Sequence, residues 1–248
     1  MQTKKWGPSA WEFIHTIAFR YPEKPTVQDA KDHKVFFNYL GTQLPCKYCR
    51  MSWSTFNGEL PIDTFMQSRS HLGLWTYLMH NKVNKKLRTQ GNPVPPDPTF
   101  NEVIEKYLSK KGMCTQKCWD FLHAITYNYP MEPTNEQKKN TAKFFESLKN
   151  VFPCLQCRKI YCALWKDIPI GPFLDSRYRL CYWLYQMHAK MNKMLVRLGN
   201  KDIPLLTGYD DFCEKYELMR AKCSKQLKTC SIPYDQKDRR KKANQKRH

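Results

Sequence analysis

Two cysteines separated by two residues follow a proline in Pro45-Cys46-Lys47-Tyr48-Cys49, ahead of a segment of helical character, Arg50–Phe56. At a helix start both thiols face the same way, and the unpaired N–H groups and dipole of the helix stabilise a thiolate. Such a pair can form a disulfide that opens and recloses readily. The same spacing is also half of a zinc site, and it occurs in thioredoxin-type redox pairs, which require a βαβ context. The motif alone leaves redox and zinc chemistry equally open.

An internal duplication indicates which elements carry these cysteines. The segment Trp11-Glu12-Phe13-Ile14-His15 returns as Trp119-Asp120-Phe121-Leu122-His123, 108 positions later. The same offset holds without a gap over roughly ninety residues, which is the signature of a tandem repeat. It relates Tyr21 to Tyr129, Phe36 to Phe144, Cys46 to Cys154, Cys49 to Cys157, Trp75 to Trp183, His80 to His188 and Asn84 to Asn192. Zinc binding would require the two distant cysteine pairs to converge, or His80 and His188 to join them, and nothing in the spacing requires that.

Each repeat reads as a bundle of helices, because glycine is scarce and apolar residues recur at helical spacing. No strand precedes a cysteine pair, which excludes a thioredoxin-like fold. We expect an all-α chain with domains at 1–110 and 111–225, followed by a basic, disordered tail at 226–248. The helices expected in the first repeat span about Ser9–Arg20 with Ser9 as N-cap, Val27–Gln43, a third after the cysteine pair, Ser68–Leu87 and Asn101–Leu108, and the second repeat closes with a helix near Tyr209–Met219.

The charge and cysteine content narrow the function classes. The formal net charge is +20, from 42 Lys+Arg against 22 Asp+Glu, which favours acidic partners. No nucleic-acid motif is present, so nucleic-acid binding is not expected as the main function. The chain has no apolar run long enough to span a bilayer, and its start lacks the apolar core of a secretory signal, so we expect an intracellular protein. Eleven cysteines in that setting favour catalytic or metal use over a disulfide framework.

An ordered set of short motifs in the first repeat resembles the Erv/ALR family of FAD-dependent sulfhydryl oxidases. The motifs are Trp6-Gly7-Pro8, Trp11-x-x-x-His15, Cys46-x-x-Cys49 and His80-Asn81-x-Val83-Asn84, and the likeness runs to about Tyr107. The resemblance implies a four-helix bundle with a short fifth helix and FAD in the bundle mouth. It also implies oxidation of protein dithiols to disulfides, with oxygen reduced to hydrogen peroxide.

The resemblance also implies roles for individual residues. Cys46 would exchange with the substrate, and Cys49 would pass electrons to the flavin; no metal is implied. The substrates would be protein dithiols or a thioredoxin-like shuttle protein. The residues expected to line FAD are Gly7, Trp11, His15, His80, Asn81, Val83, Asn84 and Lys86.

The second repeat is similar but eroded. It retains Trp119, His123, Cys154, Cys157, Trp183, His188 and Asn192, the less certain counterparts of the first site. It has Cys114-Thr115-Gln116 in place of Trp6-Gly7-Pro8, and Ala189 in place of Asn81. Because these losses fall on the flavin side, we hypothesise a diverged domain without flavin that serves as the dimer partner within one chain. The protein would then be a monomer with an internal pseudo-dimer, or a homodimer.

The other cysteines and the source are less constrained. Cys114 and Cys118 could share a helix face as a shuttle pair, Cys213, Cys223 and Cys230 offer a second candidate, and Cys162 and Cys181 are expected to be buried. The compact form resembles the family members of large DNA viruses, which places it in the host cytoplasm or virion if viral, or in the mitochondrial intermembrane space if cellular. Two rival interpretations remain, a zinc-stabilised helical binding module with Cys46, Cys49, Cys154 and Cys157 as ligands, and a catalytically dead basic scaffold.

Overall fold

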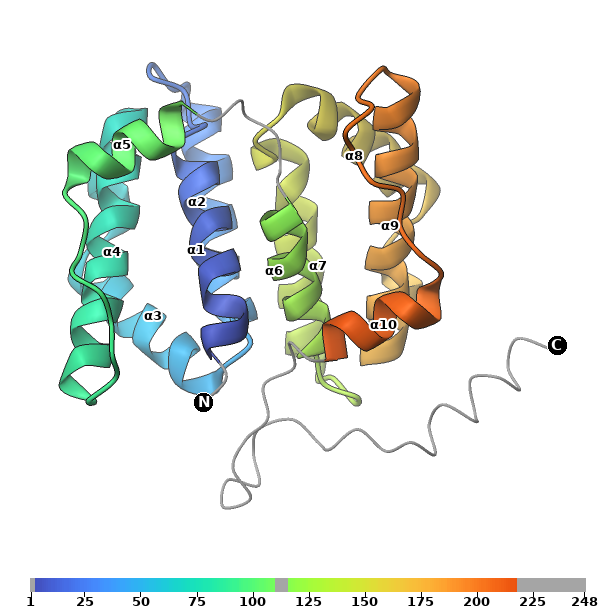
Figure 1. The fold of residues 1–248 in the computed structure, drawn as a ribbon, viewed down its shortest axis with the longest axis horizontal. Helices are drawn as coiled ribbons and strands as arrows, with labels where there is room; N and C mark the ends of the chain where they lie inside the picture. Colours follow the sequence, from blue (N-terminus) through green and yellow to red (C-terminus); the bar gives the residue numbers. More distant parts are fainter. Residues whose placement is uncertain (1–2, 110–115, 218–248) are drawn as a thin grey trace, which may run out of the picture.

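The computed structural model describes residues 3–109 and 116–217. Within these residues it contains ten α-helices, two short 3-10 helices and no strand, so the all-α prediction is confirmed (Figure 1). The first repeat comprises α1 (Thr3–Ala18), α2 (Val27–Gln43), α3 (Lys47–Glu59), η1 (Ile62–Phe65), α4 (Arg69–Thr89) and α5 (Phe100–Leu108). The second comprises α6 (Gln116–Tyr127), α7 (Asn135–Val151), α8 (Leu155–Asp167), η2 (Gly171–Phe173), α9 (Arg177–Arg197) and α10 (Tyr209–Glu217). The predicted domain boundary at 110/111 and the predicted tail at 226–248 lie outside the described residues, as do Cys114, Cys223 and Cys230.

Side-chain caps explain why most helices begin where the sequence predicts. The Thr26 hydroxyl accepts a hydrogen bond from the Asp29 N–H at 3.1 Å, and the Asp29 carboxylate accepts one from the Thr26 N–H at 2.9 Å. This reciprocal capping box satisfies two helix-end donors and starts α2. Thr134 and Gln137 repeat the arrangement at the start of α7.

The predicted start of the first helix at Ser9 is wrong, because α1 begins six residues earlier at Thr3 and includes Pro8. Ser9 is buried inside the helix and caps nothing at its end. The helix is extended by the side chain of Trp6, which is 4% exposed and stacks on Phe121 of the second repeat at 6.3 Å between ring centroids. Burial of an indole stabilises this turn enough to tolerate the hydrogen bond lost at Pro8.

The two bundles pack through their first two helices, with α1 against α6 and α2 against α7 (Figure 1). Phe13 meets Phe121 at 5.6 Å between ring centroids, and Phe36 meets its own counterpart Phe144 at 5.7 Å. One continuous apolar core therefore spans both repeats. This confirms the predicted pair of bundles packed as a pseudo-dimer within the chain.

The packing places the two cysteine pairs far apart. In Figure 1, α3 lies at the bottom of the molecule and α8 at the top, and each helix starts beside its own pair. The zinc interpretation needed the two pairs to converge. Among the described residues, no three His, Cys, Asp or Glu side chains gather in a metal-binding arrangement. No helix in those same ranges has the length and apolarity to cross a membrane.

Candidate active site

The cysteine pair of the first repeat sits at the start of α3, with Cys46 as the N-cap residue. The Cys49 thiol donates a hydrogen bond to the Cys46 sulfur, and this bond is the main reason that the pKa of Cys46 falls to about 6. Burial acts in the other direction, while the N–H groups of Cys49 and Tyr48 and the charge of Arg50 lower this pKa further. Donating the bond raises the pKa of Cys49. Near neutral pH the pair therefore shares one negative charge, carried on Cys46.

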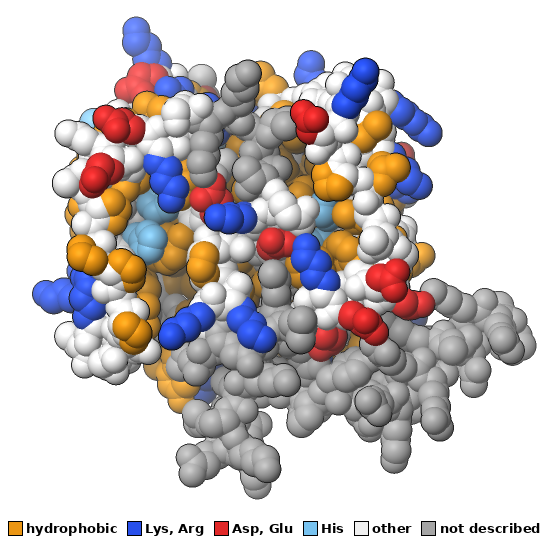
Figure 2. Space-filling view, viewed as in Figure 1, with side chains coloured by type: hydrophobic (Ala, Val, Ile, Leu, Met, Phe, Trp, Pro, Cys, Tyr) orange, Lys and Arg blue, Asp and Glu red, His pale blue; other side chains and the backbone are white. Residues whose placement is uncertain are grey.

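An aromatic and histidine cluster lies between α1 and α4. The rings of Trp11 and His80 stack with centroids 3.9 Å apart and planes 9° from parallel. Nε2 of His15 is 3.1 Å from Nδ1 of His80. Histidine side chains are visible between these two helices in the left half of the molecule (Figure 2). Because Trp11 and His80 are only partly buried, the flat faces of this cluster open toward the surface.

Hydrogen bonding determines which histidine nitrogens carry protons. Thr76 donates its hydroxyl proton to the Gly73 carbonyl at 2.9 Å, so it accepts from Nδ1–H of His15 at 3.0 Å. Burial lowers the pKa of His15 well below its ordinary value and that of His80 to about 4, so both rings are neutral at pH 7. Nε2 of His15 then accepts from Nδ1–H of His80, and Nε2 of His80 keeps an acceptor lone pair.

Polar side chains of α4 connect this cluster to the cysteines. Lys86 donates to Ser52 on α3, and its charge acts on the Cys49 thiol. Asn84 donates to Asp97 at 2.7 Å, in the segment that joins α4 to α5. Cys46 is buried and Cys49 is half-buried, so Lys86 is a fixed positive charge beside the more accessible of the two thiols.

The remaining predicted residues are less closely connected. Gly7 lies on α1, and a Cβ at its position would meet no atom within 4 Å, so the surface beside it is open. Asn81 and Val83 are half-buried on α4. The structure thus brings Trp11, His15 and His80 into contact and sets Lys86 by Cys49, while Gly7, Asn81 and Val83 lie on the same two helices.

The second repeat reproduces this geometry in a closed form. Trp119 and His188 stack at 3.9 Å and 8°, and His123 Nε2 is 3.1 Å from His188 Nδ1. Here Trp119, His188 and Asn192 are buried, at 4%, 1% and 4% exposure. Leu184 stands where the first repeat has Thr76, and within the described ranges Nδ1 of His123 and Nε2 of His188 are buried without a hydrogen-bond partner. The second cluster retains its shape but has lost the hydrogen bond that orients the first.

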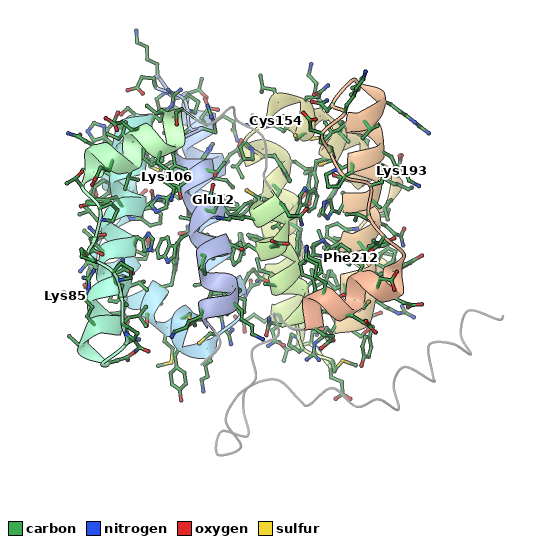
Figure 3. The ribbon with its side chains drawn as sticks, viewed as in Figure 1. Glu12, Lys85, Lys106, Cys154, Lys193 and Phe212 are labelled. Atoms are coloured by element: carbon green, nitrogen blue, oxygen red, sulfur yellow. The ribbon has the colours of Figure 1, made fainter. Side chains whose placement is uncertain are left out.

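Phe212 closes the second cluster. It reaches from α10 toward the space between α6 and α9 (Figure 3) and contacts His123 with ring centroids 4.6 Å apart. The equivalent residue of α5 is Val103, which lies 109 positions earlier in the chain, whereas the preceding helices of the two repeats are 108 positions apart. The phenyl ring therefore fills space that a valine leaves open. Met194 also replaces Lys86, so the second repeat lacks a lysine beside Cys157, the counterpart of Cys49.

Cys154 and Cys157 nevertheless keep the arrangement of a reactive pair. The Cys157 N–H donates to the Cys154 sulfur at 3.2 Å. A hydrogen bond from the Cys157 thiol is the largest cause that lowers the pKa of Cys154 to about 6, with the Cys157 and Gln156 N–H groups and Arg158 adding to it. Cys154 is half-buried and Cys157 buried. The erosion of the second repeat thus affects the cluster and spares the cysteines.

Comparison with known proteins identifies the fold family. The sequence model of the Erv1/Alr family matches this chain twice, over residues 8–104 and 116–204. The chain belongs to the Erv1/Alr family. The resemblance found in the sequence is confirmed, and the second match shows that the diverged repeat is a family domain too. No solved structure matches the chain.

Several family members of known name are similar to this chain. A probable FAD-linked sulfhydryl oxidase of Acanthamoeba polyphaga mimivirus is 35% identical over 127 residues, covering 49% of this chain and 83% of that protein. The mitochondrial FAD-linked sulfhydryl oxidase of Schizosaccharomyces pombe is 32% identical over 156 residues, covering 61% and 78%. That of Saccharomyces cerevisiae is 38% identical over 82 residues, covering 33% and 42%.

Three residues at this Erv1/Alr site escaped the sequence analysis. Thr76 orients His15, and the charge of Lys106 on α5 acts on both histidines. Figure 3 shows Lys106 extending from α5 toward the gap between α4 and α1. Tyr107 lies 5.0 Å from His15 between ring centroids and donates to Glu12 at 3.3 Å. In the second repeat Tyr216 donates the equivalent hydrogen bond to Asp120 at 2.6 Å. Tyr107 and Tyr216 are 109 positions apart, so aligning the fifth helices at this offset would have revealed Tyr107 from the sequence.

The cysteines outside the two pairs have mixed surroundings. Cys118 is fully buried in α6 within the inter-repeat core, which argues against the shuttle role considered for it with Cys114. Cys181 is buried as expected, and Cys213 packs in the same small cluster. Cys162, also expected to be buried, is only half-buried and donates weakly to the Lys149 carbonyl at 3.6 Å. A thiol inside a packed core cannot exchange with a partner unless that core opens.

Proposed function

We propose that this protein is a FAD-linked sulfhydryl oxidase that converts protein dithiols to disulfides and reduces oxygen to hydrogen peroxide, with its working site in the first repeat. The observation that carries the proposal is the open Trp11–His80 stack, whose histidine shares α4 with Lys86, the lysine whose charge acts on the Cys49 thiol. The relatives from yeasts are named FAD-linked sulfhydryl oxidases and the viral one is named a probable one, which supports both the reaction and the cofactor.

The first-repeat residues fit FAD in chemical type. Trp11 and His80 offer flat faces to a heteroaromatic ring, and Nε2 of His80 offers an acceptor for an exocyclic amine. Lys86 and Lys106 supply positive charge for a pyrophosphate, and Asn81 and Asn84 supply amides for ring or ribose edges. His15 orients His80, Gly7 leaves space on α1, and Val83 is half-buried on α4. When bound, FAD would take up the two electrons of the dithiol and deliver them to oxygen.

The thiol steps follow from the electrostatics of the pair. A substrate thiolate attacks Cys46 in the Cys46–Cys49 disulfide, and Cys49 leaves as a thiolate beside the Lys86 charge. A second substrate thiol then attacks the mixed disulfide, and Cys46 leaves. The N–H groups of Cys49 and Tyr48 and the charge of Arg50, which lower the pKa of Cys46, stabilise Cys46 as the leaving group. The Cys49 thiolate remains next to the cofactor site as the electron donor.

The second repeat, in this proposal, is a diverged domain that binds no flavin and completes the internal pseudo-dimer. The proposed domains are 1–110 and 111–225, followed by the basic segment 226–248. Three replacements support this division of roles. Phe212 stands in place of Val103 and covers His123. Leu184 replaces Thr76, which orients His15, and Met194 replaces Lys86, which carries the positive charge.

The substrates are thiols of proteins, either reduced polypeptides or a thioredoxin-like shuttle protein, and the net charge of +20 favours acidic ones. The relatives come from viral and mitochondrial sources, so the proposed location is the host cytoplasm or virion, or the intermembrane space.

The test is a visible absorption spectrum of the purified protein, flavin counted per chain after denaturation, and oxygen uptake driven by dithiothreitol. We expect a yellow protein with about one flavin per chain and thiol-dependent peroxide formation. A colourless protein that contains zinc would contradict the proposal. A flavin count near two would contradict only the role given to the second repeat.

A further inference from the structure

A cleft of about 450 Å³ lies between the two repeats, away from the aromatic and histidine cluster. The end of α2, the Leu44-Pro45 segment and α3 form one wall, and the end of α6 with the start of α7 forms the other. Its volume falls within the roughly 300–1,000 Å³ typical of ligand sites. Since the walls come from different repeats, a single bundle would not contain it.

The cleft leads to the reactive thiols of the first repeat. Pro45 lines it and directly precedes Cys46. Arg50 also lines it, donates to the Leu44 carbonyl at 2.6 Å, and lowers the pKa of Cys46 with its charge. A polypeptide that lies in the cleft therefore reaches Cys46 within one or two residues, because an extended chain advances about 3.4 Å per residue.

The lining of the cleft suits the backbone of an extended polypeptide. Asn38, Asn57 and Asn140 line it, and none of these three amide side chains has a hydrogen-bond partner in the part of the chain that the structure describes. Each amide offers both donors and an acceptor, which matches the N–H and C=O of a peptide unit. Recognition through backbone groups is independent of side-chain sequence, as a substrate class of reduced, unfolded proteins would require.

The pseudo-symmetric position beside the second cysteine pair is filled instead. Lys149, Cys162 and Trp165 stand there in place of Gly41, Ser54 and Asn57. The Lys149 ammonium lies 5.5 Å from the Trp165 ring centroid, and the Cys162 thiol donates to the Lys149 carbonyl. The cleft thus leads to the pair next to the open cluster, and larger side chains stand at the equivalent positions beside the second pair.

From this asymmetry we infer that the inter-repeat cleft is the docking site for an extended segment of a reduced protein substrate, held next to Cys46 by Asn38, Asn57 and Asn140. The inference rests on the proposed function and adds a role for the second repeat, which supplies half of the site. On this inference a small dithiol does not depend on the three amides for its reaction with Cys46.

The test compares oxygen uptake by the holoprotein with two substrates, reduced ribonuclease A and dithiothreitol. Asn57→Trp introduces the residue found in the second repeat, and Asn140→Trp fills the cleft from the opposite wall. For each variant we expect kcat/KM for reduced ribonuclease A to fall about tenfold, mainly through KM, while turnover of dithiothreitol stays within about twofold. Thr55→Trp adds the same indole to α3 outside the cleft and serves as the matched control, with both activities unchanged.

The outcomes separate this inference from the proposed function. Unchanged kinetics with ribonuclease A in both cleft variants would overturn the docking site, and so would equal losses with both substrates. A wild-type protein that fails to oxidise dithiothreitol would instead overturn the proposed function.

Discussion

The ring of Phe212 lies against the ring of His123, with centroids 4.6 Å apart and planes at 73°. In the first repeat the corresponding histidine, His15, faces Tyr107 on α5, and the residue equivalent to Phe212 is Val103. Phe212, on a short closing helix, is thus one of the side chains that close the second cluster, and the first cluster has a valine at the equivalent position.

The two stacked histidines should differ in their importance for the cofactor. We expect His80→Ala to weaken FAD binding about tenfold or more, because the stacking face and the Nε2 acceptor are lost. His188→Ala, the matched control, should leave the flavin content unchanged. Flavin absorbance of the protein after desalting measures both. Equal loss of flavin in the two variants would assign cofactor binding to both repeats.

Cys49 and its counterpart Cys157 provide a second matched pair of variants. Cys49→Ser should abolish oxygen uptake with dithiothreitol while FAD remains bound, since the proposed function makes the Cys49 thiolate the electron donor. Cys157→Ser should retain nearly full activity. If Cys49→Ser turned over dithiothreitol at the normal rate, the assignment of the active pair would be wrong.

The lowered pKa of Cys46 predicts how the alkylation rate of its thiol in the reduced protein depends on pH. Alkylation of Cys46 by iodoacetamide, followed by mass spectrometry of its peptide, should reach half its maximal rate near pH 6, where an ordinary thiol has a pKa of 9.0. The folded pKa is the lower one, so the thiolate stabilises the reduced fold above pH 9.0, and this contribution disappears as the pH falls through about 6. Cys49→Ala removes the main hydrogen-bond donor and should raise the midpoint. A midpoint near 9 in the wild-type protein would argue against the hydrogen bond.

Two glycines should respond oppositely to the same substitution. A Cβ at Gly41 would lie 2.3 Å from Cδ1 of Trp53, so Gly41→Ala should lower the free energy of unfolding by about 1–3 kcal/mol. A Cβ at Gly58, inside α3, meets nothing within 4 Å, so Gly58→Ala should raise it by about 0.5–1 kcal/mol. Urea unfolding of both variants checks the pair. A stabilising Gly41→Ala would mean that Trp53 can move aside.

Much of the fold could be predicted from the sequence because local signals agreed with the tertiary structure. The α2 segment, Val27–Gln43, has a capping residue at one end and a proline beyond the other, and its predicted bounds match. The start of α1 could not be predicted in the same way. Trp6 is ordered by Phe121, more than one hundred positions away in the chain, and no local pattern reveals such a contact.

The site divides along similar lines. The ordered motifs predicted Trp11, His15, His80 and the cysteines as site residues, since these recur with fixed spacing in both repeats. Thr76 was missed because its role depends on its contact with one ring nitrogen of His15. Lys106 was missed because its role depends on how α5 places its charge near His80. Phe212 was missed because one inserted residue shifts the offset between the fifth helices. The inter-repeat cleft depends on the angle between bundles, which no single-chain pattern encodes.

Because α1 packs on α6 and α2 on α7 within one polypeptide, the association of the two repeats does not depend on the protein concentration. A pair of separate subunits dissociates on dilution, because its assembly follows mass action. A covalently joined pair has an effective concentration set by the connecting segment and does not separate at low abundance. The specific activity of this protein should therefore stay constant over a wide dilution series.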